Sequence, residues 1–448
     1  MQDIKNITIK KKSGIKRLVP WSSEPPRNSF KRIDSEPPQR KRRLKLLLPV
    51  IACLLAAYPL FHLLVSAGNA LSSVSRTPAA KEPLPKKADS ENSFRLAREA
   101  LASASFDGSR YRADRTDGLT VYYAINPELQ DRVRKVMAEY RVPYGVFVAI
   151  EPKTGRILAL ASHSEADAGW EAQAPYNLYP MASLFKIITA AAALEQRKVT
   201  PQTVVPFRGR LTSENPRYWE TGAKRGNQEM DLTTAMGKSV NPVFGRLAND
   251  VVGKDGIMSG IERFGFNQTL LPGEPVLSSC SSEPQDGSAL MLMGAGLCKD
   301  VKISPLYAAV MMAAVANKGV MLQPLLASEI RSSQGKVLFS GESRQVRRVV
   351  SPETADQLSR MMSTTVSQGT SRKVFRDRRG RPKLAAVDIA AKTGSISGTD
   401  PPGHYSWFAA YAPINDPQIA VAALVINGAK WRIKASLLGE QALEAFFQ

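Results

Sequence analysis

The segment from Ile187 to Leu194 is almost wholly apolar, and this run constrains the fold more than any other feature of the chain. A helix that is apolar on all sides must be buried inside a domain. Pro180 lies shortly before the run, where the start of a helix tolerates proline. The chain has 448 residues and a hydrophobic content of 43%, which is ample to enclose such a helix. We therefore predict a large folded domain built around a buried helix.

Ser183 and Lys186 are predicted to lie in the first turn of this helix, on one face because they are three residues apart. Ser183 would then be close to the positive end of the helix dipole. Burial lowers the pKa of a lysine, so Lys186 would be a neutral general base beside a nucleophile. Ser-x-x-Lys is a weak pattern, since it recurs at Ser13 and Ser333. The assignment of Ser183 as nucleophile and Lys186 as base therefore depends on the buried helix and on the motifs that follow.

The formal net charge of +21 is spread unevenly along the chain. Residues 1–45 contain 14 Lys and Arg residues but only four Asp and Glu residues, and Ser-Glu-Pro-Pro occurs twice, at 23–26 and 35–38. This composition predicts a disordered basic tail. A nucleic-acid-binding tail could have the same charge, but the next segment explains the charge better. We therefore expect no nucleic-acid partner.

Residues 46–67 are predicted to form a transmembrane helix. No Asp, Glu, Lys or Arg occurs from residue 46 to residue 75, and about 20 apolar residues are enough to span a bilayer. The basic cluster at 40–45 marks the cytoplasmic side. We expect a single-pass protein of the inner (cytoplasmic) membrane, with residues 1–45 inside the cell and the catalytic domain outside the cytoplasm. A cleaved signal peptide is the alternative, although a 45-residue leading segment is long for that role.

The rest of the chain divides into a linker and one large domain. Residues 68–117 are predicted to be a linker with a short helical juxtamembrane region, and residues 118–448 the domain itself. Strands at both ends of this domain, with helices between them, predict an α/β (α+β) fold in which an antiparallel sheet is flanked by helices and interrupted by an inserted all-helical subdomain. The strands are expected at 119–125, 144–150, 156–161, 389–396, 404–411 and 418–426, and the main helices at 126–140, 304–317, 352–366 and 437–447.

Two further short motifs follow Ser183 along the chain, Ser239-Val240-Asn241 and Lys392-Thr393-Gly394-Ser395. Each motif is weak by itself, because Ser-x-Asn recurs at 90–92 and 213–215, and Lys-Thr-Gly recurs in a predicted hairpin turn at 153–155. The order of the three motifs is the specific feature. Penicillin-binding proteins and class A β-lactamases share this set.

Residues 118–448 resemble the transpeptidase domain of penicillin-binding proteins, the membrane-anchored serine enzymes that cross-link peptidoglycan. Segments 148–160, 294–319, 366–370 and 407–413 add to the resemblance. The chain departs from the family pattern at Ala182, where glycine is usual, at Val240, where aspartate is common, and at Ser395, where many members have threonine. The region before residue 118 is too short for a glycosyltransferase domain. The resemblance implies a β-lactamase/transpeptidase-like fold.

The resemblance also implies a catalytic role for five residues. Ser183 would be acylated by the carbonyl of the penultimate D-Ala and would expel the terminal D-Ala. Lys186 would take the serine proton, although the identity of the acylation base is disputed in related enzymes. Ser239 and Lys392 would carry a proton to the leaving amine. Asn241 would orient Lys186 and bind the substrate amide.

Substrate binding is implied for the third motif. Lys392, Thr393 and Ser395 would hold the terminal carboxylate, and Gly394 would leave room for substrate at the strand edge. The backbone N–H groups of Ser183 and Ser395 would form an oxyanion hole. The expected partners are peptidoglycan stem peptides, β-lactam antibiotics, the membrane, and other proteins of cell-wall synthesis or division.

Three alternative functions share these motifs. A D,D-carboxypeptidase would pass the acyl group to water, and the natural acceptor stays open from the sequence. A β-lactamase needs a group that activates water for deacylation, and no clear carboxylate motif lies between Ser183 and Ser239. A β-lactam-sensing or scaffold protein would bind without turnover, but a 45-residue tail is short for a signalling domain.

No cofactor or metal site is predicted, because His62, His163 and His404 lie far apart and outside any ligand-spaced motif.

Cys280 and Cys298 both lie in the predicted exported domain, where disulfides persist. We predict a bridge between them that would pin the loop from 281 to 287. Two free, buried thiols are the alternative.

Overall fold

The computed structural model describes residues 90–222 and 226–448. The predicted basic tail at 1–45 and the predicted transmembrane helix at 46–67 lie outside this part of the chain. Within the described residues, no helix combines the length and the apolar character needed to cross a membrane.

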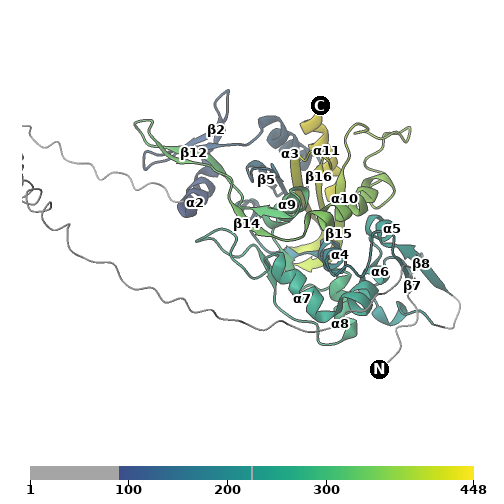
Figure 1. Ribbon diagram of the computed structural model, residues 1–448. Helices are drawn as coiled ribbons and strands as arrows, with labels where there is room; N and C mark the ends of the chain where they lie inside the picture. The colour runs from purple at the N-terminus through teal and green to yellow at the C-terminus, as the bar shows by residue number, and fades with distance from the viewer. Residues whose placement is uncertain (1–89, 223–225) are drawn as a thin grey trace, which may run out of the picture. The chain divides into compact units, whose positions relative to one another are not determined.

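The main sheet has five antiparallel strands in the order β15-β16-β17-β4-β5. Two of its strands come from the start of the domain and three from the C-terminal end, so the sheet joins the two ends of the domain (Figure 1). The predicted antiparallel sheet is confirmed. Its strands are β4 (Tyr144–Ile150), β5 (Ile157–His163), β15 (Ala390–Thr399), β16 (Pro402–Ala412) and β17 (Ile419–Asn427).

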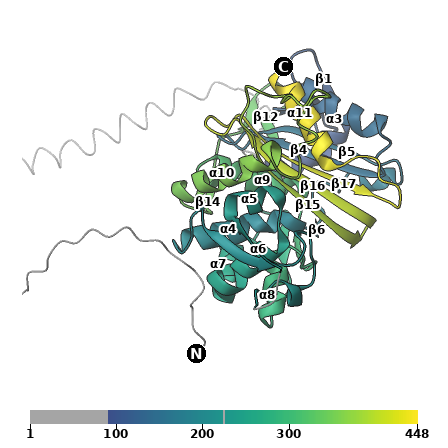
Figure 2. The same cartoon turned by 90° about the vertical axis from the view of Figure 1, so that its right-hand side faces the viewer.

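Helices cover both faces of this sheet, which explains why strand β17 is buried at every position. Alternate residues of a strand point to opposite faces. Phe147, Phe408 and Val421 face a core shared with α3 (Pro127–Glu139) and α11 (Ala435–Phe447). The other face packs on α9 (Pro305–Ala316) and α10 (Pro352–Ser367). Figure 2 shows these two pairs of helices on opposite sides of the sheet.

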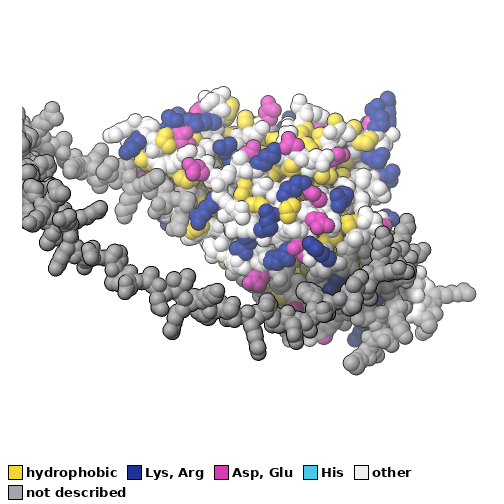
Figure 3. Space-filling model, viewed as in Figure 1, with side chains coloured by type: hydrophobic (Ala, Val, Ile, Leu, Met, Phe, Trp, Pro, Cys, Tyr) yellow, Lys and Arg dark blue, Asp and Glu magenta, His cyan; other side chains and the backbone are white. Residues whose placement is uncertain are grey.

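The surface carries charges of both signs, which are scattered over the face of the molecule that Figure 3 shows.

A mainly helical region is inserted between β5 and β15, but the prediction that it is all-helical is wrong, because it contains the β7–β8 hairpin. Its central element is α4 (Lys186–Glu195), whose residues 186–194 are all buried, so the expected buried helix is present. Helix α4 packs against α7, α10 and a turn of π-helix at Leu247–Val252. The other elements here are the β7–β8 hairpin (Val204–Arg208 and Asn227–Asp231), α5 (Leu232–Lys238), α6 (Asn241–Arg246), α7 (Gly253–Arg263) and α8 (Gly287–Gly294).

A second five-stranded sheet, in the order β1-β2-β3-β12-β13, was not predicted. The predicted strand near 119–125 exists as β3 but belongs to this sheet, where it pairs with β12 about 200 residues later. Residues 90–117, which the sequence placed in the linker region, contribute a helix and two of its strands. The elements are α2 (Ser90–Ala100), β1 (Ser105–Phe106), β2 (Tyr111–Asp114), β3 (Thr120–Tyr123), β12 (Ala327–Arg331) and β13 (Val337–Ser340).

Two small sheets complete the described fold. One contains β6 (Tyr179–Pro180), β10 (Val301–Ile303) and β9 (Ser278–Cys280), in that order, and the other pairs β11 (Val320–Leu322) with β14 (Gln345–Arg348). The three-stranded sheet matters most for function, because β6 leads directly into Ser183.

The predicted disulfide between Cys280 and Cys298 is wrong, since both residues are free thiols. Cys280 ends strand β9, where its backbone exchanges two hydrogen bonds with the Asn267 side chain at 2.9 and 3.0 Å. Its thiol donates to the carbonyl oxygen of Ser282 at 3.3 Å. The strand and the Asn267 side chain hold this loop in place without a covalent link.

Candidate active site

Ser183 lies on a short 3₁₀ turn, Ala182–Phe185, immediately before α4. Side chains three residues apart eclipse one another in a 3₁₀ helix, so Ser183 and Lys186 line up more directly than in the predicted α-helical turn. Two hydrogen bonds anchor the entrance to the turn: the Met181 N–H donates to Val301 O at 2.9 Å, and Trp407 Nε1 donates to Pro180 O at 2.9 Å.

Lys186 is completely buried, and its Nζ has three close polar neighbours. It lies 2.7 Å from Ser183 Oγ, 2.8 Å from Asn241 Oδ1 and 2.7 Å from the carbonyl oxygen of Ala295. Burial, with a smaller contribution from the charge of Lys392, lowers the pKa of Lys186 well below its ordinary value. The two residues of the first motif are therefore in direct contact, as predicted.

Asn241 is the first residue of α6, and the chain enters this helix through Ser239 in a left-handed conformation with φ of 56°. The Asn241 side chain donates from Nδ2 to the Ser213 carbonyl at 3.2 Å, and its backbone N–H donates to Leu211 O at 2.8 Å. These contacts fix the orientation of the amide, because Nδ2 must face a carbonyl. The Oδ1 atom is thereby directed at Lys186.

Lys392 lies on β15, an edge strand of the main sheet, and its side chain is also buried. Its Nζ donates to Ser239 Oγ at 2.8 Å and to the Thr393 carbonyl at 2.8 Å. Burial lowers the pKa of Lys392 to about 7. The second and third motifs therefore meet through the Ser239–Lys392 contact.

The next three residues of β15 pass in front of Ser183. The Thr393 hydroxyl lies 2.6 Å from the Thr370 hydroxyl, and the Ser395 side chain is exposed. A Cβ atom on Gly394 would lie only 3.1 Å from the Ala182 Cβ and 3.4 Å from the Ser183 nitrogen. Glycine thus lets β15 approach the turn that carries Ser183.

Ala182 adopts a left-handed conformation with φ of 53°. A Cβ atom costs roughly 1–2 kcal/mol in this region, so the backbone here favours glycine although the chain has alanine. Gly296 packs against the same turn, because a Cβ on it would lie 2.2 Å from the Ala182 carbonyl oxygen. The turn is therefore held between Gly394 and Gly296.

Sequence reasoning did not assign three residues that contact the site, Ala295, Thr370 and Ser213. Ala295 and Thr370 lie in segments that support the resemblance. Ala295 acts through its backbone carbonyl, which its residue type does not reveal, and Thr370 contacts Thr393 through its hydroxyl. Thr370 is placed by its backbone N–H, which donates to Gly237 O at 3.0 Å, beside the second motif. The signal for Ser213 was a weak Ser-x-Asn repeat with no expected function.

The repeat of the Lys-Thr-Gly motif at 153–155 lies away from the site. Lys153 is exposed and pairs with Asp416 at 2.5 Å.

His404 pairs in register with Ser397 of β15 and stacks on Trp431. Across residues 90–222 and 226–448, no group of three or more His, Cys, Asp or Glu side chains could hold a metal ion.

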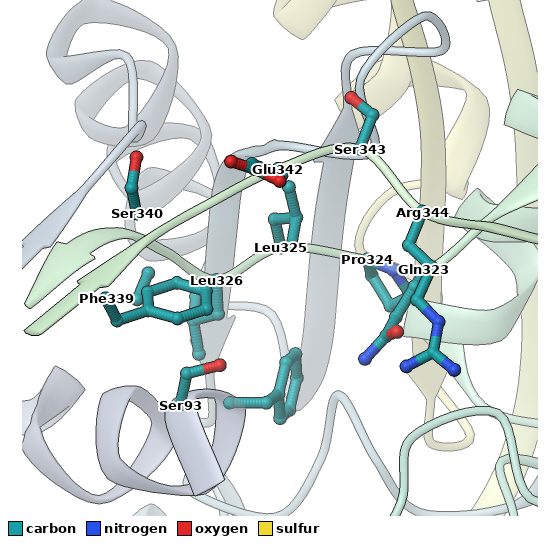
Figure 4. A pocket seen from close by; sticks show the side chains of 12 residues that line it. Ser93, Gln323, Pro324, Leu325, Leu326, Phe339, Ser340, Glu342, Ser343 and Arg344 are labelled. Carbon is teal, nitrogen blue, oxygen red and sulfur yellow. The ribbon is translucent and has the colours of Figure 1, made fainter. Parts of the chain in front are cut away.

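A separate hollow of about 330 Å³ lies between α2 and segments 323–327 and 339–344. Figure 4 shows Ser93 from the helix on one side of it and Gln323 and Arg344 on the other. None of its lining residues belongs to the three motifs.

A profile of the penicillin binding protein transpeptidase domain matches residues 145–441. This range covers the main sheet, the helical region and all three motifs. The chain therefore belongs to the penicillin-binding protein transpeptidase family, and the predictions of this family, of its fold and of a serine transpeptidase are confirmed.

The peptidoglycan D,D-transpeptidase PbpA of Mycobacterium tuberculosis is 32% identical over 348 residues, which cover 70% of this chain and 68% of that protein. The stage V sporulation protein D of Bacillus subtilis is 26% identical and covers 69% of this chain, which spans half of that protein. The solved structure of M. tuberculosis penicillin-binding protein A as an imipenem acyl-enzyme complex has a TM-score of 0.59 and 28% identity, with coverage of 73% of this chain and 79% of that one.

Proposed function

We propose that this protein is a peptidoglycan D,D-transpeptidase in which Ser183 is the acylated nucleophile. The observation that carries the proposal is the 2.7 Å contact between Ser183 Oγ and the Nζ of a fully buried Lys186. Burial favours the neutral amine, and a neutral amine can accept the serine proton as the hydroxyl attacks a carbonyl.

The hydrogen-bonding capacity of Lys186 supports its role as the base. A neutral amine has two N–H donors and one lone pair. Asn241 Oδ1 and the Ala295 carbonyl oxygen can only accept, so they take the two N–H groups at 2.8 and 2.7 Å. The lone pair is then left for the Ser183 hydroxyl. Asn241 and Ala295 in this way orient the lone pair of Lys186 Nζ toward the Ser183 hydroxyl.

We infer that Ser239 and Lys392 protonate the leaving amine. Acylation breaks the bond between the two terminal D-Ala residues, joins the penultimate carbonyl carbon to Ser183 Oγ and releases D-Ala. The Ser239 hydroxyl lies 2.8 Å from Lys392 Nζ, so it can pass a proton outward and recover one from the lysine. In the second half-reaction an acceptor amine attacks the acyl-serine and gives its proton through Ser239 to Lys392, while Lys186 returns the serine proton to Ser183 Oγ as the ester bond breaks.

We infer that β15 binds the substrate by its open edge. An edge strand presents backbone groups that pair with an extended peptide. Lys392, Thr393 and Ser395 would hold the terminal carboxylate, and the Thr370–Thr393 contact of 2.6 Å would orient the threonine hydroxyl. The backbone N–H groups of Ser183 and Ser395 would form the oxyanion hole, where one donor is worth about 10²–10³ in rate.

The surroundings of Ser183 favour an amine acceptor over a β-lactamase reaction. Among the described residues, no hydrogen bond or ion pair links an Asp or Glu side chain to Ser183, Lys186, Ser239 or Lys392. A carboxylate that activates water for rapid deacylation is therefore not provided by these contacts.

We further propose that residues 46–67 anchor the enzyme in the inner membrane, with the catalytic domain on the outer side. The basic cluster at 40–45 and the charge-free segment after it support this orientation. Stem peptides and β-lactams would then be reached outside the cytoplasm, together with other cell-wall or division proteins. A phosphatase fused after Thr120 should be active only if it is exported, and an inactive fusion would reverse the topology.

Labelling with a fluorescent penicillin tests the proposed nucleophile. The full-length protein should form a stable adduct whose labelled peptide contains Ser183. Ser183→Ala should abolish the label while the circular-dichroism spectrum and melting temperature stay close to those of the wild type. A label that persists, or that maps to Ser13 or Ser333, would exclude Ser183. Rapid hydrolysis of the adduct would instead indicate a β-lactamase.

A further inference from the structure

Residues 372–383, between α10 and β15, form a strongly basic loop that we call the basic hairpin. Seven of its twelve residues are Lys or Arg, and one is Asp. Figure 1 shows it in yellow-green, projecting beside α10, and Figure 3 shows several dark blue side chains close together at the same corner of the molecule. The three motifs of the active site lie outside this segment, so the proposed reaction does not account for its charge.

Asp377 holds the tip of the basic hairpin in one conformation. Its carboxylate accepts hydrogen bonds from the backbone N–H groups of Arg379 at 2.8 Å and Arg381 at 2.9 Å, and it pairs with the Arg381 guanidinium at 2.8 Å. Arg376 and Pro382 face each other as an isolated antiparallel bridge. The one acidic side chain of the hairpin is therefore used inside the turn.

The base of the basic hairpin is fixed to the main sheet and to α11. Phe375 is buried and stacks on Phe408 of β16, with ring centroids 5.8 Å apart. Lys383 pairs at 3.0 Å with Glu440 of α11, which is completely buried. Such a pair resists separation, because breaking it would leave an unpaired charge in the interior. The hairpin is therefore a rigid part of the fold.

Four cations of the basic hairpin have no partner in residues 90–222 and 226–448. Arg372, Lys373, Arg378 and Arg379 are exposed, and their side chains make no ion pair or hydrogen bond within these residues. Like charges that are gathered in one place repel one another, so an anionic partner would relieve this repulsion. Because the hairpin is already ordered, binding would not have to order it first.

The chemistry of the tip favours the phosphate groups of a lipid surface over a protein partner. The exposed residues of the tip are Arg378, Arg379, Gly380, Arg381 and Pro382. They offer no aromatic or large aliphatic side chain, whereas the centre of a protein–protein interface is enriched in aromatic residues and Met. The planar guanidinium of arginine matches the geometry of phosphate oxygens.

The proposed membrane anchor keeps the basic hairpin near a surface of this kind. Residues 68–89 separate the proposed anchor from α2, and a chain of this length reaches at most roughly 75 Å. Tethering converts a second contact with the bilayer into an intramolecular event. Anionic headgroups attract each Lys or Arg that comes close to the surface. Weak electrostatic contacts are therefore enough to hold the domain on the bilayer.

We propose that the basic hairpin is a docking surface for the anionic phospholipid headgroups of the membrane in which the chain is anchored. The four unpaired cations contact the lipid phosphates. Because the hairpin leads directly into β15, the strand that carries Lys392, this contact also fixes how the active site faces the bilayer. The inference goes beyond the proposed reaction and rests on the proposed anchor alone.

Covalent labelling of arginine side chains in the full-length protein tests the proposal. The protein is inserted into lipid discs of phosphatidylcholine alone, or of equal parts phosphatidylcholine and phosphatidylglycerol, and is treated with phenylglyoxal. Mass spectrometry gives the labelling rates of Arg378 and Arg379 relative to Arg217, an exposed arginine outside the hairpin. Labelling of the tip should be slower by about tenfold or more in the anionic discs, and high salt should remove the difference.

Paired substitutions at the base of the hairpin test the charge without removing the labelled arginines. Arg372→Gln combined with Lys373→Gln should lose most of the protection. Arg372→Lys combined with Lys373→Arg keeps both charges and should retain it. Lys299→Gln combined with Lys302→Gln is the matched control, because it removes two exposed cations outside the hairpin, and it should also retain the protection.

Equal labelling in the two kinds of disc would overturn the proposal, as would protection that the paired glutamine variant of the hairpin leaves unchanged. Protection by soluble polyglutamate without protection in the anionic discs would indicate an acidic protein partner and would also overturn it. The result is distinct from a test of the anchor, because entry into both kinds of disc depends on residues 46–67, whereas protection of the tip depends on the charge of the lipid.

Discussion

Gly394 and Ala182 should be energetically coupled, because a Cβ on Gly394 would lie closest to the Cβ of Ala182. In Gly394→Ala the new Cβ would lie 3.1 Å from the Ala182 Cβ, 3.2 Å from the Trp407 Cβ and 3.4 Å from the Ser183 nitrogen. Overpacking of this kind typically costs about 1–3 kcal/mol. The turn that carries Ser183 must also move by a few tenths of an ångström.

The rate of acylation should fall more clearly than stability. A misplacement of about 1 Å can cost 10²-fold in rate, so a shift of tenths of an ångström should reduce acylation by roughly tenfold. Ala182→Gly alone removes the strain of a left-handed alanine, roughly 1–2 kcal/mol, but loses about 0.4–1 kcal/mol through the more flexible unfolded chain. Its free energy of unfolding should therefore rise by between about 0 and 1.6 kcal/mol relative to the wild type.

The double variant is the decisive measurement. Ala182→Gly removes one of the three close contacts that the Cβ introduced by Gly394→Ala would meet, so the pair should show a favourable coupling of about 1 kcal/mol in a double-mutant cycle. Denaturation and the rate of penicillin acylation at Ser183 are both measured, with Gly428→Ala as the control, since a Cβ there meets nothing within 4 Å. Strictly additive effects on both quantities would refute the steric argument.

Three further predictions concern the lysines and Thr370. Burial lowers the pKa of Lys392 to about 7, so its positive charge is present below that pH and lost above it. The kcat/KM for carboxylate-terminated peptides should therefore fall as the pH rises through about 7. Lys392→Arg should remove this alkaline limb but lower the overall rate, because arginine stays charged and cannot supply the proton that Lys392 gives to Ser239. Lys392→Ala should cut acylation by orders of magnitude, whereas Lys153→Ala should change labelling little, since it removes only an exposed ion pair with Asp416; the reverse result would contradict the assignment of the third motif. Thr370→Val should lower the rate of peptide acylation by about fivefold through loss of the hydrogen bond to Thr393. An unchanged rate in single-turnover assays would exclude a role of the Thr370 hydroxyl in substrate binding.

The sequence alone indicated the family, the five strands of the main sheet and the main helices. The order of Ser183, Ser239 and Lys392 indicated one site through the resemblance to a family that shares the three motifs, and each motif is short enough to be recognised locally. The buried helix after Lys186 and the antiparallel strands near both ends followed from unbroken apolar runs and alternating patterns. These signals need no knowledge of distant neighbours.

Only the tertiary structure decided how the catalytic side chains are oriented and which backbone groups surround them. The carbonyl groups of Ala295 and Ser213 act through backbone atoms, which every residue has, so no residue type could mark them. The left-handed backbone of Ala182 reflects its place between Gly394 and Gly296, more than 100 residues further along the chain. The strands from residues 90–123 are short and are completed by β12, and the loop at Cys280 is held by Asn267 and strand pairing without a disulfide. Each of these features depends on contacts between segments far apart in the sequence, which local patterns do not encode.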